Sequence, residues 1–292
     1  MNYSNFLEKI NRVKNLKIEV IGRSWDNRDI LSVSTFFDEK KPWFIIQGAI
    51  HAREHLSTDF IMWLIGVIDD NYHYFKNLSD FPNICFVPMV NPDGVEIVHY
   101  GENAIRDKEL KCIMKNILKS VDHRLIKCNA RGVDLNNNFD AGWEMHSGAD
   151  KPYFYGFKGE YKNSERETQV LVSLTQRIRP IFTISYHLKG EEIYYDFHQH
   201  GKVRERDYKI ANIISKTNGY KVVSVENSSF GGFKDWCVKV FKIPAVTIEL
   251  GRDELSHPVP SSELNNILQK NASTLHVFCD IVKIWKKYNE MI

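Results

Sequence analysis

Cysteine is scarce in this sequence and shows none of the spacings that form disulfide frameworks or bind metal. The 292 residues include five cysteines, an odd number with no CxxC pair. We therefore expect reduced thiols, most of them small core residues. A disulfide-stabilised secreted fold and a cysteine-bound zinc site are both excluded by this pattern.

An excess of charge and long apolar runs are also missing. Lys plus Arg number 39 and Asp plus Glu number 37, which gives a formal net charge of +2. Such a balance gives no reason to expect a nucleic acid or an anionic membrane as partner. No apolar run is long enough to cross a bilayer. Residues 1–16 have helical spacing but no secretion-signal pattern, so we expect a helical N-terminal extension and a cytoplasmic location.

Four common catalytic motifs are absent as well. The sequence contains no GxSxG elbow, no GxxxxGK[ST] loop, no GxGxxG turn and no HExxH helix. Serine hydrolases, P-loop enzymes, Rossmann enzymes and thermolysin-like peptidases therefore lose their usual support.

What the sequence does contain is an alternation of short apolar runs with longer amphipathic segments, and no linker divides it. This pattern predicts one α/β domain over residues 1–292, with a largely parallel or mixed sheet. The expected strands are 17–21, 30–34, 43–49, 84–90, 181–186, 222–225 and 245–250. The expected helices are 58–75, 104–121, 164–179, 205–217, 233–241 and 262–287. The irregular, aromatic-rich segment 122–161 is too long to be a simple connection and is expected to serve function.

Candidate catalytic side chains lie where the expected strands end. His51 and Glu54 follow strand 43–49, His187 follows strand 181–186, and Glu249 lies near the end of strand 245–250. Ligands of open α/β sheets bind outside the carboxyl ends of the strands. If these strands are parallel neighbours, the four side chains meet at one edge.

Two imidazoles and a carboxylate suit Zn²⁺, which keeps its fourth position for water in catalytic sites. Zinc lowers the pKa of water towards ~7, and Glu249 could then move a proton to the leaving amine. Each piece alone is weak: an HxxE spacing arises readily by chance, and Glu249 could instead form a salt bridge with an arginine. Together they indicate hydrolysis of an acyl bond, most often an amide.

Five segments, in order along most of the chain, resemble the zinc metallocarboxypeptidase (carboxypeptidase A-like) family. They are GAIHARE at 48–54, NPDG at 91–94, GVDLN at 132–136, SYH at 185–187 and TIEL at 247–250. The resemblance implies a mixed, commonly eight-stranded sheet flanked by helices, with one Zn²⁺ per chain. It makes His51, Glu54 and His187 the metal ligands and Glu249 the general base. Arg53 would help to polarise the substrate, together with Lys127 or Arg131.

The departures from the family pattern concern the substrate. Digestive carboxypeptidases have an Asn-Arg pair where this chain has Asn136-Asn137, and that arginine grips the C-terminal carboxylate. Asparagine cannot supply a charged bidentate fork. Phe230 precedes the base where the family often has a mobile tyrosine. We expect Asn136 to contact substrate, with Arg252 and the 122–161 segment as further candidates for reading carboxylates.

The pattern is most similar to the bacterial γ-D-glutamyl-diaminopimelate peptidase branch. This resemblance implies a zinc peptidase that cuts peptidoglycan stem peptides, with a peptide or muropeptide as partner. Three alternatives stay open: a C-terminal carboxypeptidase on ordinary peptides, an aspartoacylase-like deacylase of N-acyl amino acids, and a non-catalytic peptide-binding protein. The sequence decides neither the oligomeric state nor exo- against endopeptidase action.

Overall fold

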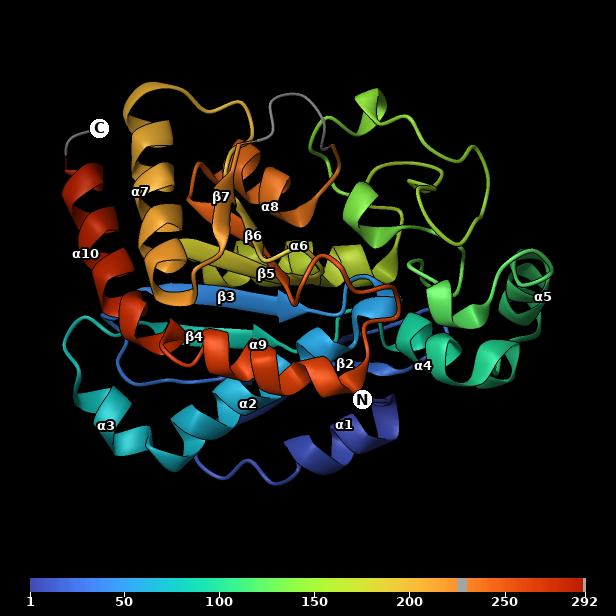
Figure 1. Cartoon of the computed structure of the whole chain (residues 1–292), viewed down its shortest axis with the longest axis horizontal. Coiled ribbons are helices and arrows are strands. Elements are labelled where there is room, and N and C mark those ends of the chain that lie inside the picture. The colour runs from blue at the N-terminus through green and yellow to red at the C-terminus, as the bar shows by residue number, and fades with distance from the viewer. Residues whose placement is uncertain (225–229, 291–292) are drawn as a thin grey trace.

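The fold is organised by one eight-stranded sheet whose four inner strands are parallel. The computed structural model describes residues 1–224 and 230–290, and within them the strand order is β1-β2-β4-β3-β5-β8-β6-β7 (Figure 1). The strands are β1 (Lys17–Arg23), β2 (Asp29–Ser34), β3 (Trp43–Gly48), β4 (Asn83–Val87), β5 (Phe182–Leu188), β6 (Glu192–Tyr194), β7 (Lys221–Val223) and β8 (Ala245–Leu250). Strands β4, β3, β5 and β8 run parallel, whereas β1, β2 and β6 pair antiparallel to their inner neighbours. The expected mixed, mainly parallel α/β sheet is confirmed.

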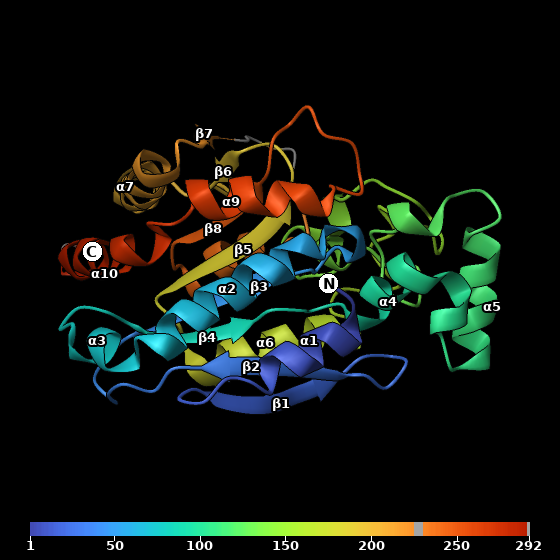
Figure 2. The same ribbon diagram turned by 60° about the horizontal axis from the view of Figure 1, so that its bottom comes forward.

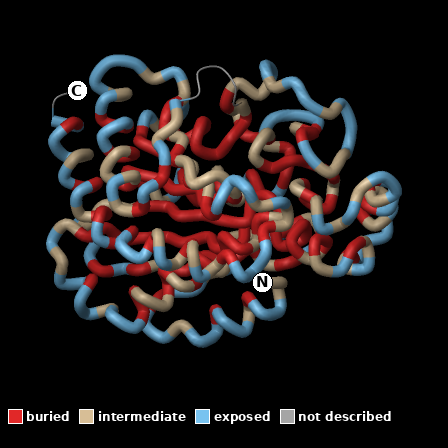
Figure 3. The backbone as a smooth tube through the Cα atoms, viewed as in Figure 1, coloured by how far each residue is buried: buried red, intermediate tan, exposed pale blue. Residues whose placement is uncertain are grey.

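The inner strands are apolar along their length because both faces of the sheet are covered. In β3, Phe44 and Ile46 join one core, and Ile45 between them joins the core of the opposite face. Every residue of β5 is buried. Figure 3 shows the buried centre of the molecule between exposed outer surfaces. Continuous apolar runs are the sequence signature of such two-sided burial.

Helices form a layer on each face of this sheet. They are α1 (Tyr3–Ile10), α2 (Leu56–Asp70), α3 (Tyr72–Asn77), α4 (Pro92–Tyr100), α5 (Lys108–Ile117), α6 (Arg166–Ile178), α7 (Gly201–Asn218), α8 (Phe233–Trp236), α9 (Leu264–Lys270) and α10 (Phe278–Asn289). The core beneath α1, α2, α7, α9 and α10 is the larger one, and α6 and α8 cover the other face. Figure 2 shows α2 and α9 crossing in front of the strands. No described helix combines the length and apolar character that a membrane span requires.

Several expected elements have different bounds. The helix expected over 58–75 is two helices, α2 and α3, that meet at Asn71, and the one expected over 262–287 is α9 and α10. Helix α4, which begins at Pro92, and strand β6, which has only three residues, were not among the expected elements. At the N-terminus, where a helical extension was expected over residues 1–16, helix α1 spans Tyr3–Ile10. Residue 225 of the expected strand 222–225 lies outside the described residues.

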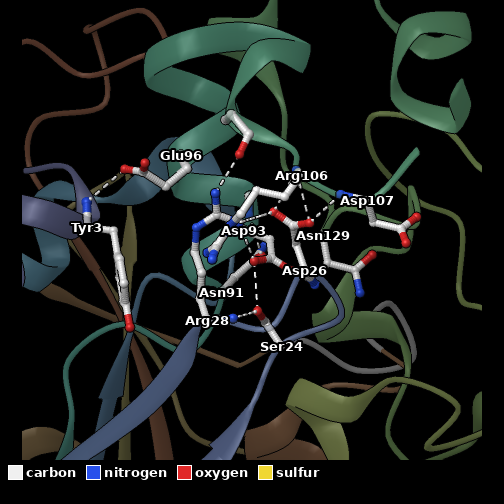
Figure 4. A network of polar contacts seen from close by, with 12 residues as sticks. Tyr3, Ser24, Asp26, Arg28, Asn91, Asp93, Glu96, Arg106, Asp107 and Asn129 are labelled. Atoms are coloured by element: carbon white, nitrogen blue, oxygen red, sulfur yellow. Dashed lines mark hydrogen bonds and ion pairs between the residues drawn. The ribbon is translucent and has the colours of Figure 1, made fainter. Parts of the chain in front are cut away.

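A buried polar network joins the NPDG turn to the β1–β2 connection (Figure 4). The Asp93 carboxylate accepts hydrogen bonds from Ser24 Oγ at 2.7 Å, from the Asp26 amide at 2.8 Å and from the Arg28 guanidinium at 2.8 Å. Asp26 in turn accepts from the backbone amides of Arg106 and Asp107 ahead of α5. Since a buried charge is tolerated only when paired, this network holds the NPDG turn, β2 and α5 in one arrangement.

Glu167 borders this network and provides a test of it. Burial, together with the charges of Asp93 and Glu165, raises the pKa of Glu167 to about 8. The folded chain therefore keeps a proton that the unfolded chain releases near the ordinary value of 4.5. By linkage, this group makes the free energy of unfolding fall as the pH rises from about 5 to about 8.

We predict that Glu167→Gln flattens this pH dependence and makes the protein more stable than wild type above pH ~7, because the amide stays neutral. Urea unfolding at pH 5, 6, 7 and 8 measures the effect. Glu160→Gln is the control, since Glu160 is 70% exposed. A parallel pH profile for Glu167→Gln and wild type would contradict the prediction.

Candidate metal centre and substrate pocket

Two neighbouring parallel strands, β3 and β5, deliver the candidate ligands to one edge of the sheet. His51 lies three residues beyond the end of β3, directly before the short 3-10 turn Ala52–Glu54. Between β3 and that turn, Ala49 has the left-handed φ of +48°. His187 is the penultimate residue of β5, the strand next to β3. The predicted convergence therefore follows from the parallel β3–β5 pairing.

The donor atoms of His51, Glu54 and His187 all lie within 4.8 Å of one another, and the three residues are buried. His51 Nδ1 is 2.9 Å from one carboxylate oxygen of Glu54, and His187 Nδ1 is 3.0 Å from the other. The two Nδ1 atoms are 3.1 Å apart. Two imidazole nitrogens and a carboxylate oxygen so arranged fit the ligand set of a catalytic zinc site. Among the described residues, no other group of this kind occurs.

The electrostatics of this group favour a cation. Burial alone would raise the pKa of Glu54, but the two imidazoles outweigh it and hold that pKa well below its usual range. Burial lowers the pKa of His187. On the far side of His51, Nε2 lies 3.3 Å from Asp134 Oδ1. A carboxylate at Nε2 favours the proton on that nitrogen, which leaves Nδ1 free to bind a metal.

Glu249 lies beside this group through strand register. In the parallel pairing of β5 with β8, Glu249 is directly opposite His187. Its Oε2 is buried and has no hydrogen-bond partner among the described residues. Burial, and next the charge of Glu54, raise the pKa of Glu249 to about 8. A carboxylate so placed has no arginine partner of its own, so the salt-bridge alternative finds no support among the described contacts.

The NPDG turn fixes the loop that carries Lys127 against the loop that carries His51. Asn91 Nδ2 donates to the carbonyl oxygens of Ile50 at 3.3 Å and Cys128 at 3.1 Å. A Cβ on Gly94 would lie 2.6 Å from the Cys128 carbonyl oxygen, so only glycine allows this approach. The Ala52 amide also donates to the carbonyl oxygen of Lys127. Lys127 is therefore held next to the metal group by backbone contacts.

A cavity of about 630 Å³ opens beside His51. Its walls come from the 127–137 segment, from the irregular 146–156 segment and from Phe230. The lining residues are His51, Lys127, Asp134, Asn136, Asn137, His146, Ser147, Gly148, Ala149, Tyr153, Tyr155, Gly156 and Phe230. Asp134 is engaged with His51, so Lys127 is the remaining charged side chain in this described lining. We call this cavity the substrate pocket.

The expected substrate-binding residues divide into two groups. Lys127 and Asn136 line the substrate pocket, and the Asn136 amide oxygen accepts the Phe233 N–H at 3.2 Å. Arg131 instead pairs with Glu165 at 3.1 Å and stacks on Trp25. Arg252 pairs with Glu263 at 2.9 Å. Neither of these two arginines lines the substrate pocket.

Arg53 lies close to the metal group and to Glu249. The charges of Glu54, Asp134 and Glu249 act on its guanidinium, although burial is the larger influence and lowers its pKa. Its Nε is buried without a partner among the described residues. This orphaned donor is consistent with the expected interaction with substrate.

Several pocket residues carry no sequence signal of their own. Tyr153 and Tyr155 belong to the aromatic-rich segment that was expected to be functional, but only the structure shows that they line the pocket. His146 lies there too, with Nε2 3.3 Å from the Gly156 carbonyl oxygen. His257 borders the metal group, where burial and Arg53 lower its pKa to about 4.

Comparison with known proteins assigns the family. Residues 3–274 match the family model described as zinc carboxypeptidase. The chain belongs to the zinc carboxypeptidase family. Zinc is accordingly the metal expected at the His51, Glu54 and His187 group.

Curated relatives include an endopeptidase and a carboxypeptidase. The chain is 30% identical over 236 residues to gamma-D-glutamyl-L-diamino acid endopeptidase 1 of Lysinibacillus sphaericus, covering 77% of this chain and 58% of that protein. It is 28% identical over 177 residues to carboxypeptidase B of Helicoverpa zea, covering 60% of this chain and 39% of the relative. The chain thus spans little more than half of the first relative's length.

Solved structures share the fold. Bovine thrombin-activatable fibrinolysis inhibitor, in complex with tick carboxypeptidase inhibitor, superposes with a TM-score of 0.72 at 21% identity, covering 99% of this chain and 96% of that one. Murein-tripeptide amidase MpaA from Escherichia coli O157 gives a TM-score of 0.56 at 20% identity, with 91% of both chains covered. These similarities extend to the fold and not to a substrate.

We predict that Asp134→Asn weakens zinc binding by about 10- to 100-fold, because the carboxylate that orients His51 is lost. Competition with a chromogenic chelator measures the zinc Kd. Asp140→Asn is the control, since Asp140 pairs with Lys162 at the surface, 2.9 Å away. Equal zinc affinity of Asp134→Asn and the control would contradict a role for Asp134 at the metal group.

Proposed function

We propose that this chain is a zinc-dependent peptidase that hydrolyses the amide between γ-D-glutamate and a diamino acid in peptidoglycan stem peptides. The observation that carries the proposal is the buried His51, Glu54 and His187 group with Glu249 opposite His187 on the adjacent strand. This is the minimum set for metal-assisted amide hydrolysis: three ligands and one proton-transfer group.

The roles of the protein side chains follow from their positions. A zinc ion held by the three ligands supplies Lewis-acid chemistry and makes water a competent nucleophile at neutral pH. The positive charge of zinc beside Glu249 would lower its raised pKa, and the ionised carboxylate would then take the proton from the attacking water and deliver it to the leaving nitrogen. Lys127 and Arg53 carry positive charge near the developing oxyanion and stabilise it.

Two observations favour a stem peptide over an ordinary C-terminal substrate. At the family's carboxylate-gripping position the chain has Asn137, which lines the substrate pocket without a charge. The pocket offers only Lys127 as an unpaired cation among its described lining residues. The 30% identity to a gamma-D-glutamyl-L-diamino acid endopeptidase agrees with this substrate class.

The test of this function is mass spectrometry of products from purified tri- and tetrapeptide stems containing meso-diaminopimelate. We expect cleavage between γ-D-glutamate and the diamino acid, its loss with a chelator, and its return with Zn²⁺. Removal of only the terminal D-alanine would instead identify a carboxypeptidase. Turnover of N-acyl amino acids in place of stem peptides would identify a deacylase, and either result contradicts the proposal.

We predict that Glu249→Gln lowers kcat by about 10²- to 10⁴-fold, because the amide cannot accept a proton. Zinc content, measured by inductively coupled plasma mass spectrometry, should stay at one per chain. Glu254→Gln is the control, since Glu254 is 67% exposed just beyond the same strand. Near-normal turnover by Glu249→Gln would refute its role as base.

A further inference from the structure

One wall of the substrate pocket comes from the irregular loop between Trp143 and Lys158. This part of the chain belongs to the yellow-green loops at the upper right of Figure 1. Its outgoing arm contributes His146, Ser147 and Gly148 to the pocket, and its returning arm contributes Tyr153, Tyr155 and Gly156. We call residues 143–158 the wall loop. The two arms are held in different ways, and this difference carries the inference.

The returning arm is fixed by backbone hydrogen bonds to the segment next to the metal group. The Lys127 and Cys128 amides both donate to the Phe154 carbonyl oxygen, and the Asp134 amide donates to that of Phe157 at 2.8 Å. The Gly156 amide donates to Asp134 Oδ2 at 3.1 Å, and Asp134 Oδ1 faces His51. This arm is therefore held against the 127–134 segment by main-chain hydrogen bonds.

Besides the His146 ring, whose Nε2 lies 3.3 Å from the Gly156 carbonyl oxygen, the side chain that anchors the outgoing arm is Lys158. Its ammonium donates to the carbonyl oxygens of Trp143 and His146, both at 3.0 Å, and lies 4.3 Å from the centre of the Trp143 ring. Trp143 Nε1 returns a hydrogen bond to the Lys158 carbonyl oxygen at 2.9 Å. Charge-assisted hydrogen bonds and a cation–π contact are strong for their size, and here all converge on one ammonium group.

The outgoing arm packs so closely against the returning arm that there is no space for a side chain at Gly148. The Ala149 amide donates to the Gly156 carbonyl oxygen at 3.1 Å, and a Cβ on Gly148 would lie 2.2 Å from that same oxygen. The arms therefore touch backbone to backbone. A loosened outgoing arm would withdraw His146, Ser147 and Gly148 from the pocket, whereas the contacts of Asp134 with Gly156 and His51 would remain.

We propose that Lys158 is a positioning residue for substrate binding: it closes the wall loop and thereby shapes the substrate pocket without lining it. The expected effect on KM rests on the proposed peptidase function, whereas the expected effect on the position of the wall loop does not. Lys158 sets KM, while the metal group and Glu249, which it does not contact, set kcat.

The experiment compares Lys158→Met, Lys158→Gln and Lys158→Arg with Lys162→Met on the chain loaded with zinc. Lys162 belongs to the same region but forms only surface ion pairs, with Asp140 and Glu144. We expect Lys158→Met to raise KM for the stem tripeptide about tenfold with kcat changed less than about threefold, since uniform binding is lost. Lys158→Gln, whose side chain is too short to reach both carbonyl oxygens, should raise KM in the same way and replaces Lys158→Met if that variant does not fold. Lys158→Arg, which keeps charge and donors, should recover most of the affinity.

Hydrogen exchange provides a second readout that is independent of turnover. Amides in 143–149 should exchange at least about tenfold faster in Lys158→Met, with β3, β5 and β8 unchanged, because local opening exposes only the outgoing arm. Unchanged exchange would overturn the proposal whatever the chain hydrolyses. A wild-type KM in an active Lys158→Met variant, or an equal KM increase in Lys162→Met, would overturn it as well. If the wild-type protein cleaves no stem peptide, the proposed function fails. The hydrogen-exchange rates of residues 143–149 then decide alone whether Lys158 holds the wall loop closed.

Discussion

The burial of Glu54 between two imidazoles is the interaction on which the rest of the site depends. A carboxylate removed from water costs several kcal/mol unless opposite charge compensates for it. Here the compensation comes from His51, His187 and the divalent cation that the group fits. The segment after β3 and the end of β5 must therefore meet, and the parallel order β3–β5–β8 brings them together with Glu249 alongside. The sheet satisfies this electrostatic requirement through its topology.

Further contacts around the metal group hold its residues in place. Asp134 faces the far nitrogen of His51, and Asn91 ties the loop after β3 to the loop carrying Lys127. Behind them, the buried Asp93 with Ser24 and Arg28 keeps the NPDG turn in place. Each contact is local, but together they link the β1–β2 connection to a site at the carboxyl ends of β3 and β5. The motif residues outside the metal group thus have structural tasks that maintain its geometry.

Sequence patterns predicted the features that repeat along the chain or depend on strand order. The sheet, its inner strands and the meeting of His51, Glu54 and His187 follow from apolar runs and from residues at strand ends. Helix breaks were harder, because Asn71 interrupts an amphipathic pattern that continues on both sides. Loop geometry was beyond reach. Lys127 and Arg131 are four residues apart and equally basic, and only the fold separates the one in the pocket from the one stacked on Trp25.

The backbone-to-backbone contact between Gly148 and Gly156 has a consequence for how this scaffold can diversify. Among the described residues, the outgoing arm forms no strand pairing with the sheet, and the returning arm contacts the 127–134 segment mainly through main-chain hydrogen bonds. Other residues of the outgoing arm can therefore be substituted without disturbing the metal group, provided that Gly148 and Lys158 are kept. Substrate selectivity can then evolve in the wall loop, while reactivity stays with the metal group and Glu249 at the strand ends.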